Sequence, residues 1–180
     1  MSTLVAYASM HGATRGIAER IAATLGVAGE EAEARPVGAV DDLTGYGAFV
    51  VGSAVYSMHW QKEASEFVRR NHAVLASRPV WLFSSGPLGT EATDAVGRDL
   101  TVAAEPKEIA EFRRTIGPQD HRVFFGALDP GRLGFAERLV RKMPAARAVL
   151  PEGDFRDWAE IDAWASGIAH HVAESRAGPC

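Results

Sequence analysis

The feature of this 180-residue sequence that most restricts its possible folds is a set of continuous apolar runs, in which apolar and polar residues do not alternate. Residues 3–8, 48–53 and 80–85 form such runs, which are typical of strands covered on both faces of a sheet. Residues 32–37 and 123–128 are predicted to be two further strands. Apolar residues at helical spacing predict helices over residues 15–25, 61–76, 106–116, 132–143 and 155–173. Strands that alternate with helices require parallel crossovers, so we predict an α/β fold with a doubly wound sheet flanked by helices.

Composition and length indicate a single globular domain. The chain carries 23 acidic and 19 basic residues, a formal net charge of −4, so no overall basic field favours nucleic acid. The single cysteine, Cys180, excludes an internal disulfide. No apolar run approaches the roughly 20 residues of a membrane span, and no signal-peptide pattern opens the sequence. We expect a cytoplasmic protein with one domain over residues 1–175 and a flexible tail over residues 176–180.

The turn between the first predicted strand and helix carries the strongest functional signal. This first loop, residues 9–14, contains the hydroxyl residues Ser9 and Thr14 around Gly12. N–H groups at a helix start lack intrahelical partners and the helix dipole favours an anion there, so the loop is a candidate phosphate site. Arg15 opposes the dipole unless an anion is nearby, which supports this interpretation. The alternative is an ordinary, well-capped β–α turn.

Two further loops follow predicted strands. The second loop, residues 52–60, and the third loop, residues 84–89, are both rich in small and hydroxyl residues, and the second adds aromatic residues. In an open parallel sheet a ligand lies beyond the carboxyl ends of the strands, where the strand order reverses. A phosphate site beside two loops that can border a flat ring favours flavin mononucleotide (FMN).

Three patches of the sequence resemble one known group of proteins. They cover residues 7–18, residues 51–68, and residues 125–143 together with residues 157–170. In these patches the chain is similar to the flavodoxin superfamily and, within it, to the quinone-dependent protoporphyrinogen oxidase group; over residues 86–119 it departs from that group. The resemblance implies a five-stranded parallel sheet of order 2-1-3-4-5 with FMN bound non-covalently.

The resemblance also implies which residues bind FMN. The phosphate would be held, chiefly by backbone N–H groups, at Ser9, Met10, His11, Gly12, Ala13 and Thr14. The isoalloxazine ring would be bordered on one side by Ser53, Ala54, Val55 and Tyr56, and on the other by Ser85, Gly86 and Pro87. Common flavodoxins have threonine and asparagine where this chain has His11 and Ala13. His11 either adds positive charge near the phosphate or is a solvated turn residue.

By the same resemblance, the protein is an oxidoreductase of heme biosynthesis that passes electrons from a porphyrinogen through FMN to a quinone. His59 is the candidate proton-handling residue, because histidine titrates near neutrality; a solvated histidine at a helix start is the alternative. Tyr56 and Trp60 either stack on the flavin or substrate, or pack within the protein. Two other functions stay open: a flavodoxin-type electron carrier that serves a redox partner protein, and an interaction module without a cofactor.

A basic amphipathic segment over residues 132–147 carries Arg132, Arg138, Arg141 and Lys142. Such segments lie on anionic membranes or dock anionic partners, so peripheral contact with the inner face of the membrane is one expectation and a solvated face is the other. A homodimer is also open. The long connection at residues 86–104 is expected to be a functional lid or disordered. The dinucleotide, P-loop and nucleophile-elbow motifs are absent, and no spacing of residues predicts a metal site.

Overall fold

The structure, a computed structural model, describes residues 1–89, 93, 97, 99–129, 131 and 152–177. Its centre is a parallel sheet in the order β2-β1-β3-β5-β6. These strands are β1 (Ser2–Ala8), β2 (Ala32–Pro36), β3 (Tyr46–Tyr56), β5 (Val80–Ser85) and β6 (Asp120–Phe124). A short strand, β4 (His59–Trp60), pairs antiparallel with the end of β3. Counted without β4, the order is the expected 2-1-3-4-5, which confirms the flavodoxin-like sheet.

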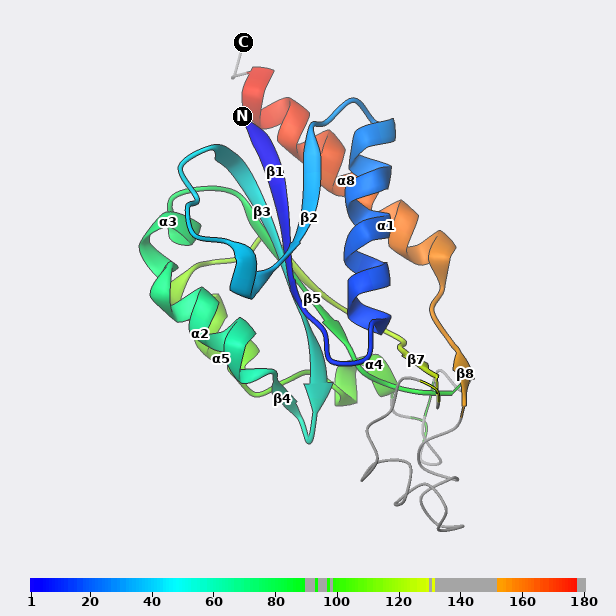
Figure 1. Ribbon diagram of the computed structural model, residues 1–180. Coiled ribbons are helices and arrows are strands. Elements are labelled where there is room, and N and C mark those ends of the chain that lie inside the picture. Colours follow the sequence, from blue (N-terminus) through cyan, green and yellow to red (C-terminus); the bar gives the residue numbers. More distant parts are fainter. Residues whose placement is uncertain (90–92, 94–96, 98, 130, 132–151, 178–180) are drawn as a thin grey trace.

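Helices cover both faces of the sheet (Figure 1). On one face lie α1 (Ala13–Val27) and α8 (Trp158–Ala177). On the other lie α2 (Lys62–Arg70), α3 (His72–Ala76) and α5 (Glu108–Thr115). The turn η1 (Val37–Ala39) and the short helix α4 (Leu100–Ala103) belong to connections. Because each crossover returns to a parallel strand, the carboxyl ends of the five strands share one edge, the lower edge in Figure 1.

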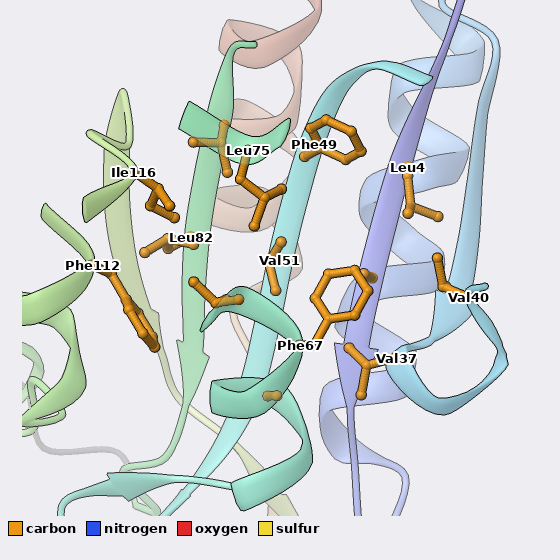
Figure 2. Packing of buried hydrophobic residues seen from close by; sticks show 14 of the residues in the cluster. Leu4, Val37, Val40, Phe49, Val51, Phe67, Leu75, Leu82, Phe112 and Ile116 are labelled. Atoms are coloured by element: carbon orange, nitrogen blue, oxygen red, sulfur yellow. The ribbon is translucent and has the colours of Figure 1, made fainter. Parts of the chain in front are cut away.

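Successive residues of the inner strands enter two separate apolar clusters. On β3, Phe49 and Val51 pack on the side of α2 and α5, whereas Val50 packs on the side of α1 and α8. Figure 2 shows the first cluster, where Phe67 of α2 and Phe112 of α5 cover the strands. All five side chains are at most 1% exposed. The unbroken apolar run at residues 48–53 therefore is a strand buried on both faces, as predicted.

Two predicted boundaries differ because polar groups interrupt the expected element. The helix predicted over residues 61–76 divides at Asn71, whose side-chain amide donates to the carbonyl of Phe67 at 2.9 Å. The strand predicted over residues 123–128 begins earlier, at Asp120, and ends at Phe124. An edge strand tolerates polar residues such as Asp120, which hid its start in the sequence.

Other differences concern the second half of the chain. Residues after β6 form β7 (Ala127–Leu128), which pairs antiparallel with β8 (Gly153–Asp154). The helix predicted over residues 155–173 extends to Ala177, so the first two residues of the expected tail are helical. The described part of the connection at residues 86–104 contains α4, whose N-terminus is capped by Asp99.

The helix predicted over residues 132–143, with Arg132, Arg138, Arg141 and Lys142, lies outside the described residues. In the part of the chain that the structure describes, no helix combines the length and apolar character needed to cross a bilayer.

Gly52 of β3 permits the closest packing between neighbouring strands. It is opposite Phe83 of β5, and a Cβ at Gly52 would lie 2.0 Å from the Cζ atom of that ring. The ring of Phe83 is held in turn by Phe124 and Trp164, at centroid distances of 6.3 Å and 6.5 Å. It therefore cannot move aside without disturbing the core between the sheet and α8.

We expect Gly52→Ala to lower the free energy of unfolding by about 1–3 kcal/mol, the usual cost of overpacking a core. Urea unfolding followed by circular dichroism measures the effect. Gly45→Ala is the matched control, because nothing lies within 4 Å of a Cβ at that position. Equal stabilities of the two variants would contradict the packing argument.

A polar contact joins the two helices on the first face. Arg20 of α1 donates to both oxygens of Asp162 on α8, at 2.7 Å and 2.5 Å, and Thr24 donates to the same carboxylate at 2.8 Å. The hydrogen bonds from Arg20 and Thr24 lower the pKa of Asp162 from 3.8 to about 2. The folded state therefore favours the ionised carboxylate, and the contact stabilises the protein only while that carboxylate is charged.

Because the pKa of Asp162 is depressed on folding, its contribution is complete above about pH 4 to 5 and disappears as the pH falls toward 2. We therefore expect the stability gap between wild type and Asp162→Asn to be constant near neutrality and to close in acid. Urea unfolding across this pH range measures the gap. The control is Asp41→Asn, the same substitution at an exposed position in the connection after η1; a gap that closed equally for both variants would contradict the argument.

Candidate cofactor site

Three strand ends meet where the order of the sheet reverses. Ala8 of β1 is opposite Ser53 of β3, and Ser53 is opposite Ser84 of β5. Neighbouring strands lie about 4.8 Å apart, so the first, second and third loops leave the sheet side by side. The chain passes from β1 to β2 on one side and reaches β3 on the other, which makes this the switch point at which α/β sheets bind ligands.

The first loop leads into the N-terminus of α1, which lies at this edge and has no side-chain cap. Gly12 has a left-handed φ of 89°, and no side chain makes a capping hydrogen bond to the N-terminus of α1. Within the loop, the N–H of Gly12 donates to Ser9 Oγ at 3.1 Å. Thr14 is 1% exposed, and its hydroxyl oxygen has no partner among the described residues. The capped-turn alternative is therefore not what the structure has, and unpaired polar groups remain for an anion.

The expected imbalance at Arg15 is resolved within the helix. The Arg15 guanidinium donates to Glu19, one turn later, at 2.7 Å, and both side chains are at least half exposed, at 62% and 50%. This pair offsets the unfavourable position of a cation in the first turn. Arg15 is thus compensated by a carboxylate of its own helix, and its presence gives no independent evidence for a bound anion.

A second arginine, which sequence reasoning missed, makes a hydrogen bond to the backbone of the first loop. Arg156, which precedes α8, donates to the carbonyl of Ala13 at 3.2 Å and lies 4.4 Å from the centroid of the Trp158 ring. Its two hydrogen bonds to Asp154, at 2.8 Å and 2.6 Å, hold the pKa of that carboxyl below its usual range. A Cβ at Gly16 would lie 2.5 Å from the Arg156 guanidinium, so glycine leaves the space for it.

Two cavities flank the first loop. One, of about 630 Å³, lies between His11, Arg15 and Arg156 and the paired strands β7 and β8. The other, of about 520 Å³, lies on the β2 side, next to Tyr7 and Pro36. In the described structure neither cavity is lined by the second or third loop. The three loops therefore meet at the sheet edge, and these two cavities lie beside the first loop alone.

The second loop is largely a hairpin between β3 and β4. Val55 pairs with Trp60, and the turn between the strands places Ser57 and Met58 at φ values of 50° and 66°. Left-handed residues at both turn positions are typical of a type I′ hairpin, whose twist suits the flanking strands. The turn leaves two large apolar side chains on the surface, Tyr56 at 44% and Met58 at 38% exposed.

Hydrogen bonds fix the base of this hairpin to neighbouring loops. Ser53 is buried, and its hydroxyl accepts from the N–H of Gln61 at 2.9 Å and donates to the carbonyl of Ala54 at 2.8 Å. The hydroxyl of Ser53 is therefore used within the protein. With its amide oxygen turned toward the first loop, Gln61 also accepts from the N–H of Met10 at 3.1 Å. Sequence reasoning missed this link, because Met10 is far from Gln61 in the sequence and no local pattern joins them.

The third loop contacts the second directly. A Cβ at Gly86 would lie 3.3 Å from the Cβ of Val55, so an added side chain would require Val55 to shift by a few tenths of an ångström. The N–H of Gly86 donates to the carbonyl of Phe124 at 3.2 Å, and the N–H of Gly126 donates to the carbonyl of Pro87 at 2.8 Å. Ser85, between the sheet and this turn, is buried. The loop is thus fastened to the segment after β6.

His59 and Trp60 have different surroundings. His59 is half exposed and lies 2.7 Å from Glu108 of α5. Burial alone would raise the pKa of Glu108, but hydrogen bonds from His59 and from backbone N–H groups outweigh burial and lower it. Trp60 is only 4% exposed; its indole packs 5.4 Å from Phe112 and donates to Ser84 Oγ at 2.8 Å. Of the two interpretations of Trp60, packing is correct.

Comparisons with known proteins agree with this geometry. The chain is similar to a flavodoxin from the domain Archaea, with 17% identity and a TM-score of 0.60 over 96% of this chain and 99% of that one. It is similar to oxidised flavodoxin 2 from Bacillus cereus, with 22% identity and a TM-score of 0.54 over 97% and 99%. A third structure is rubredoxin:oxygen oxidoreductase from Desulfovibrio gigas, with 14% identity and a TM-score of 0.61.

The chain covers 37% of the Desulfovibrio protein, with 98% of its own length aligned. At such identities these likenesses establish the fold alone. No curated protein sequence matches the chain. The sequence pattern of the flavodoxin domain, however, matches residues 4–148, which is most of the chain. The protein therefore belongs to the flavodoxin domain family.

Proposed function

We propose that the protein binds FMN non-covalently, with the phosphate at the first loop. The observation that carries this proposal is the uncapped start of α1 at the switch point, where Gly12 in a left-handed conformation precedes the helix. Helix N-termini bind phosphate through free N–H groups and the helix dipole, and flavodoxins hold FMN at this place in the sheet. When bound, FMN supplies the electron transfer, whereas the protein supplies binding and orientation.

The residues of this chain divide these tasks. The backbone of the first loop and the buried hydroxyl of Thr14, which has no partner within the described structure, would hydrogen-bond the phosphate. Hydrogen bonds to a charged group are worth about 1.5–3 kcal/mol, and an unpaired buried group costs about 1–3 kcal/mol, so phosphate binding would remove a penalty at Thr14. Residues 53–56 and residues 85–87 would border the flavin ring, with Tyr56 on the exposed side.

For the reaction, we propose an oxidoreductase that resembles quinone-dependent protoporphyrinogen oxidase. Each cycle would remove two electrons and two protons from a porphyrinogen and reduce one quinone to the quinol. Support comes from the three patches of sequence resemblance and from the exposed apolar side chains of Tyr56 and Met58, which provide a surface for a planar substrate beside the flavin loops. His59, half exposed on the same hairpin and 2.7 Å from Glu108 of α5, is the candidate for proton exchange with water.

A flavodoxin-type electron carrier is the second candidate function. It is favoured by one observation, that the chain aligns with 99% of stand-alone flavodoxins such as that of Bacillus cereus. In this case a redox partner protein would replace the organic substrate. For the proposed oxidoreductase, peripheral membrane contact and dimerisation stay predictions from the sequence.

The cofactor proposal predicts near-stoichiometric binding of FMN by the purified protein, seen as flavin absorption bands and quenching of FMN fluorescence. Thr14→Val would weaken binding by about tenfold to a hundredfold, because one hydrogen bond to a charged phosphate is lost. Gly12→Val would weaken it further, because a β-branched residue is strained at a φ of 89°. Thr115→Val, the same chemical change on α5, is the control and leaves binding unchanged. Protein that ignores added FMN would overturn the proposal.

The choice between enzyme and carrier is made with the FMN-loaded protein. If it is the proposed oxidoreductase, protoporphyrinogen and a menaquinone analogue will yield porphyrin fluorescence faster than autoxidation does. His59→Gln, which removes the imidazole ring beside Glu108, would lower this rate. Reduction by a ferredoxin reductase without turnover of the porphyrinogen would instead support the carrier.

A further inference from the structure

A chain of buried polar side chains lies beneath the second and third loops, on the α2–α5 face of the sheet. Trp60 Nε1 lies 2.8 Å from Ser84 Oγ, and Ser84 Oγ lies 2.8 Å from His121 Nε2. His121 Nδ1 lies 3.3 Å from an oxygen of Glu105, whose carboxylate receives two hydrogen bonds from Arg113, at 2.8 Å and 2.6 Å. The exposed fractions of the first three side chains are 4%, 0% and 2%, so no solvent separates them.

The chemistry of these groups permits one arrangement of protons. The indole N–H of Trp60 can only donate, so Ser84 Oγ accepts from it. Arg113 holds the pKa of Glu105 below its usual range, against the effect of burial, and an ionised carboxylate can only accept. His121 therefore carries its proton on Nδ1, toward Glu105, and its bare Nε2 accepts from the hydroxyl of Ser84. The indole N–H, the serine hydroxyl, both ring nitrogens of His121 and the carboxylate of Glu105 then each have a hydrogen-bond partner.

A second proton on His121 would break this arrangement. It would sit on Nε2 and point at Ser84, whose own hydroxyl proton would then lose its acceptor in a place without solvent. Burial lowers the pKa of His121, Glu105 and Asp120 raise it, and Arg113 lowers it again, with burial the largest effect. The neutral ring that the geometry requires is thus also the ring that its surroundings favour.

Serine, histidine and a carboxylate in series also form the nucleophilic triad of hydrolases. Here Ser84 is fully buried, and its oxygen already accepts the indole N–H of Trp60. No substrate carbonyl could approach this oxygen. These hydrogen-bonded side chains therefore have a structural role, and Ser84 is not a nucleophile.

We propose that His121 is a positioning residue of the FMN site, acting through Ser84 and Trp60. Trp60 pairs with Val55 across the second loop, and Ser84 is the first residue of the third loop. The polar chain therefore ties the two loops that would border the flavin ring to one buried histidine on β6. This inference rests on the proposed function: the hydrogen-bonded side chains would keep the two loops that border the flavin at a constant separation.

The test compares FMN dissociation constants of full-length variants by quenching of FMN fluorescence. His121→Phe fills the space but removes both hydrogen bonds, and Trp60→Phe removes only the indole donor. Each would weaken FMN binding about threefold to tenfold, the effect of one or two net hydrogen bonds. Because both act through Ser84, the double variant would lose little more than either single variant. His121→Gln, which keeps an acceptor toward Ser84, would restore most of the affinity.

A matched control separates positioning from general loss of stability. Val123→Ala is two residues along β6 from His121, on the same face, buried and opposite Ser84; it removes packing there but has no side-chain hydrogen bond to lose. It lowers stability without weakening FMN binding. If Val123→Ala and His121→Phe weakened binding in proportion to their loss of stability, the inference would be overturned.

The pH profile supplies a second reading. Because burial holds the pKa of His121 below its usual range, its protonation needs a pH below that range, where it would loosen the loops; wild-type affinity for FMN would then fall more steeply than that of His121→Gln. The phosphate of FMN titrates in the same range but affects both proteins equally. Wild-type protein that does not bind FMN would overturn the proposed function and this inference with it. Normal binding by wild type that His121→Phe and Trp60→Phe leave unchanged would overturn this inference alone.

Discussion

Burial of β3 on both faces is the constraint on which the rest of the molecule depends. Strands covered on both faces are typical of parallel sheets, and a parallel neighbour is reached by a crossover over a face of the sheet, usually as a helix. The glycine at position 52 and the ring of Phe83 tighten this arrangement, because the strands accept no added side chain at that contact. The carboxyl ends of β1, β3 and β5 consequently share one edge, and the candidate site exists only because they do.

Polar groups at this edge divide into those already paired and those left open. The hydroxyl of Ser53, the N–H of Gly86 and the indole of Trp60 are paired within the protein, so the second and third loops keep their shape without a ligand. The start of α1 and the hydroxyl of Thr14 are without such partners in the described structure. Two internally hydrogen-bonded loops beside a helix start with unpaired polar groups suit a cofactor whose ring is bordered by the loops and whose phosphate is hydrogen-bonded at the helix.

Periodicity, and glycine and hydroxyl residues close together in the chain, were sufficient to locate the strands of the main sheet and the three loops. The order of the strands has no such local pattern and was predicted from the family resemblance. The sequence could not reveal Gln61, Arg156 or His121, whose contacts lie with residues far away in sequence. Trp60 stayed ambiguous for the same reason, since burial at a strand end is decided by helix α5. The break at Asn71 was missed because one side-chain hydrogen bond outweighs a continuous apolar stripe.

Charge around the first loop is largely balanced before any ligand arrives. Arg15 is paired with Glu19, and Arg156 is paired with Asp154 while it donates to the carbonyl of Ala13. Neither guanidinium is then the main attraction for a phosphate. In the proposed site the backbone N–H groups and the dipole of α1 would supply most of the affinity for phosphate, and both are fixed by the fold rather than by side chains. Arg156 contributes by holding the loop in place, much as His121 does for the two loops beside it.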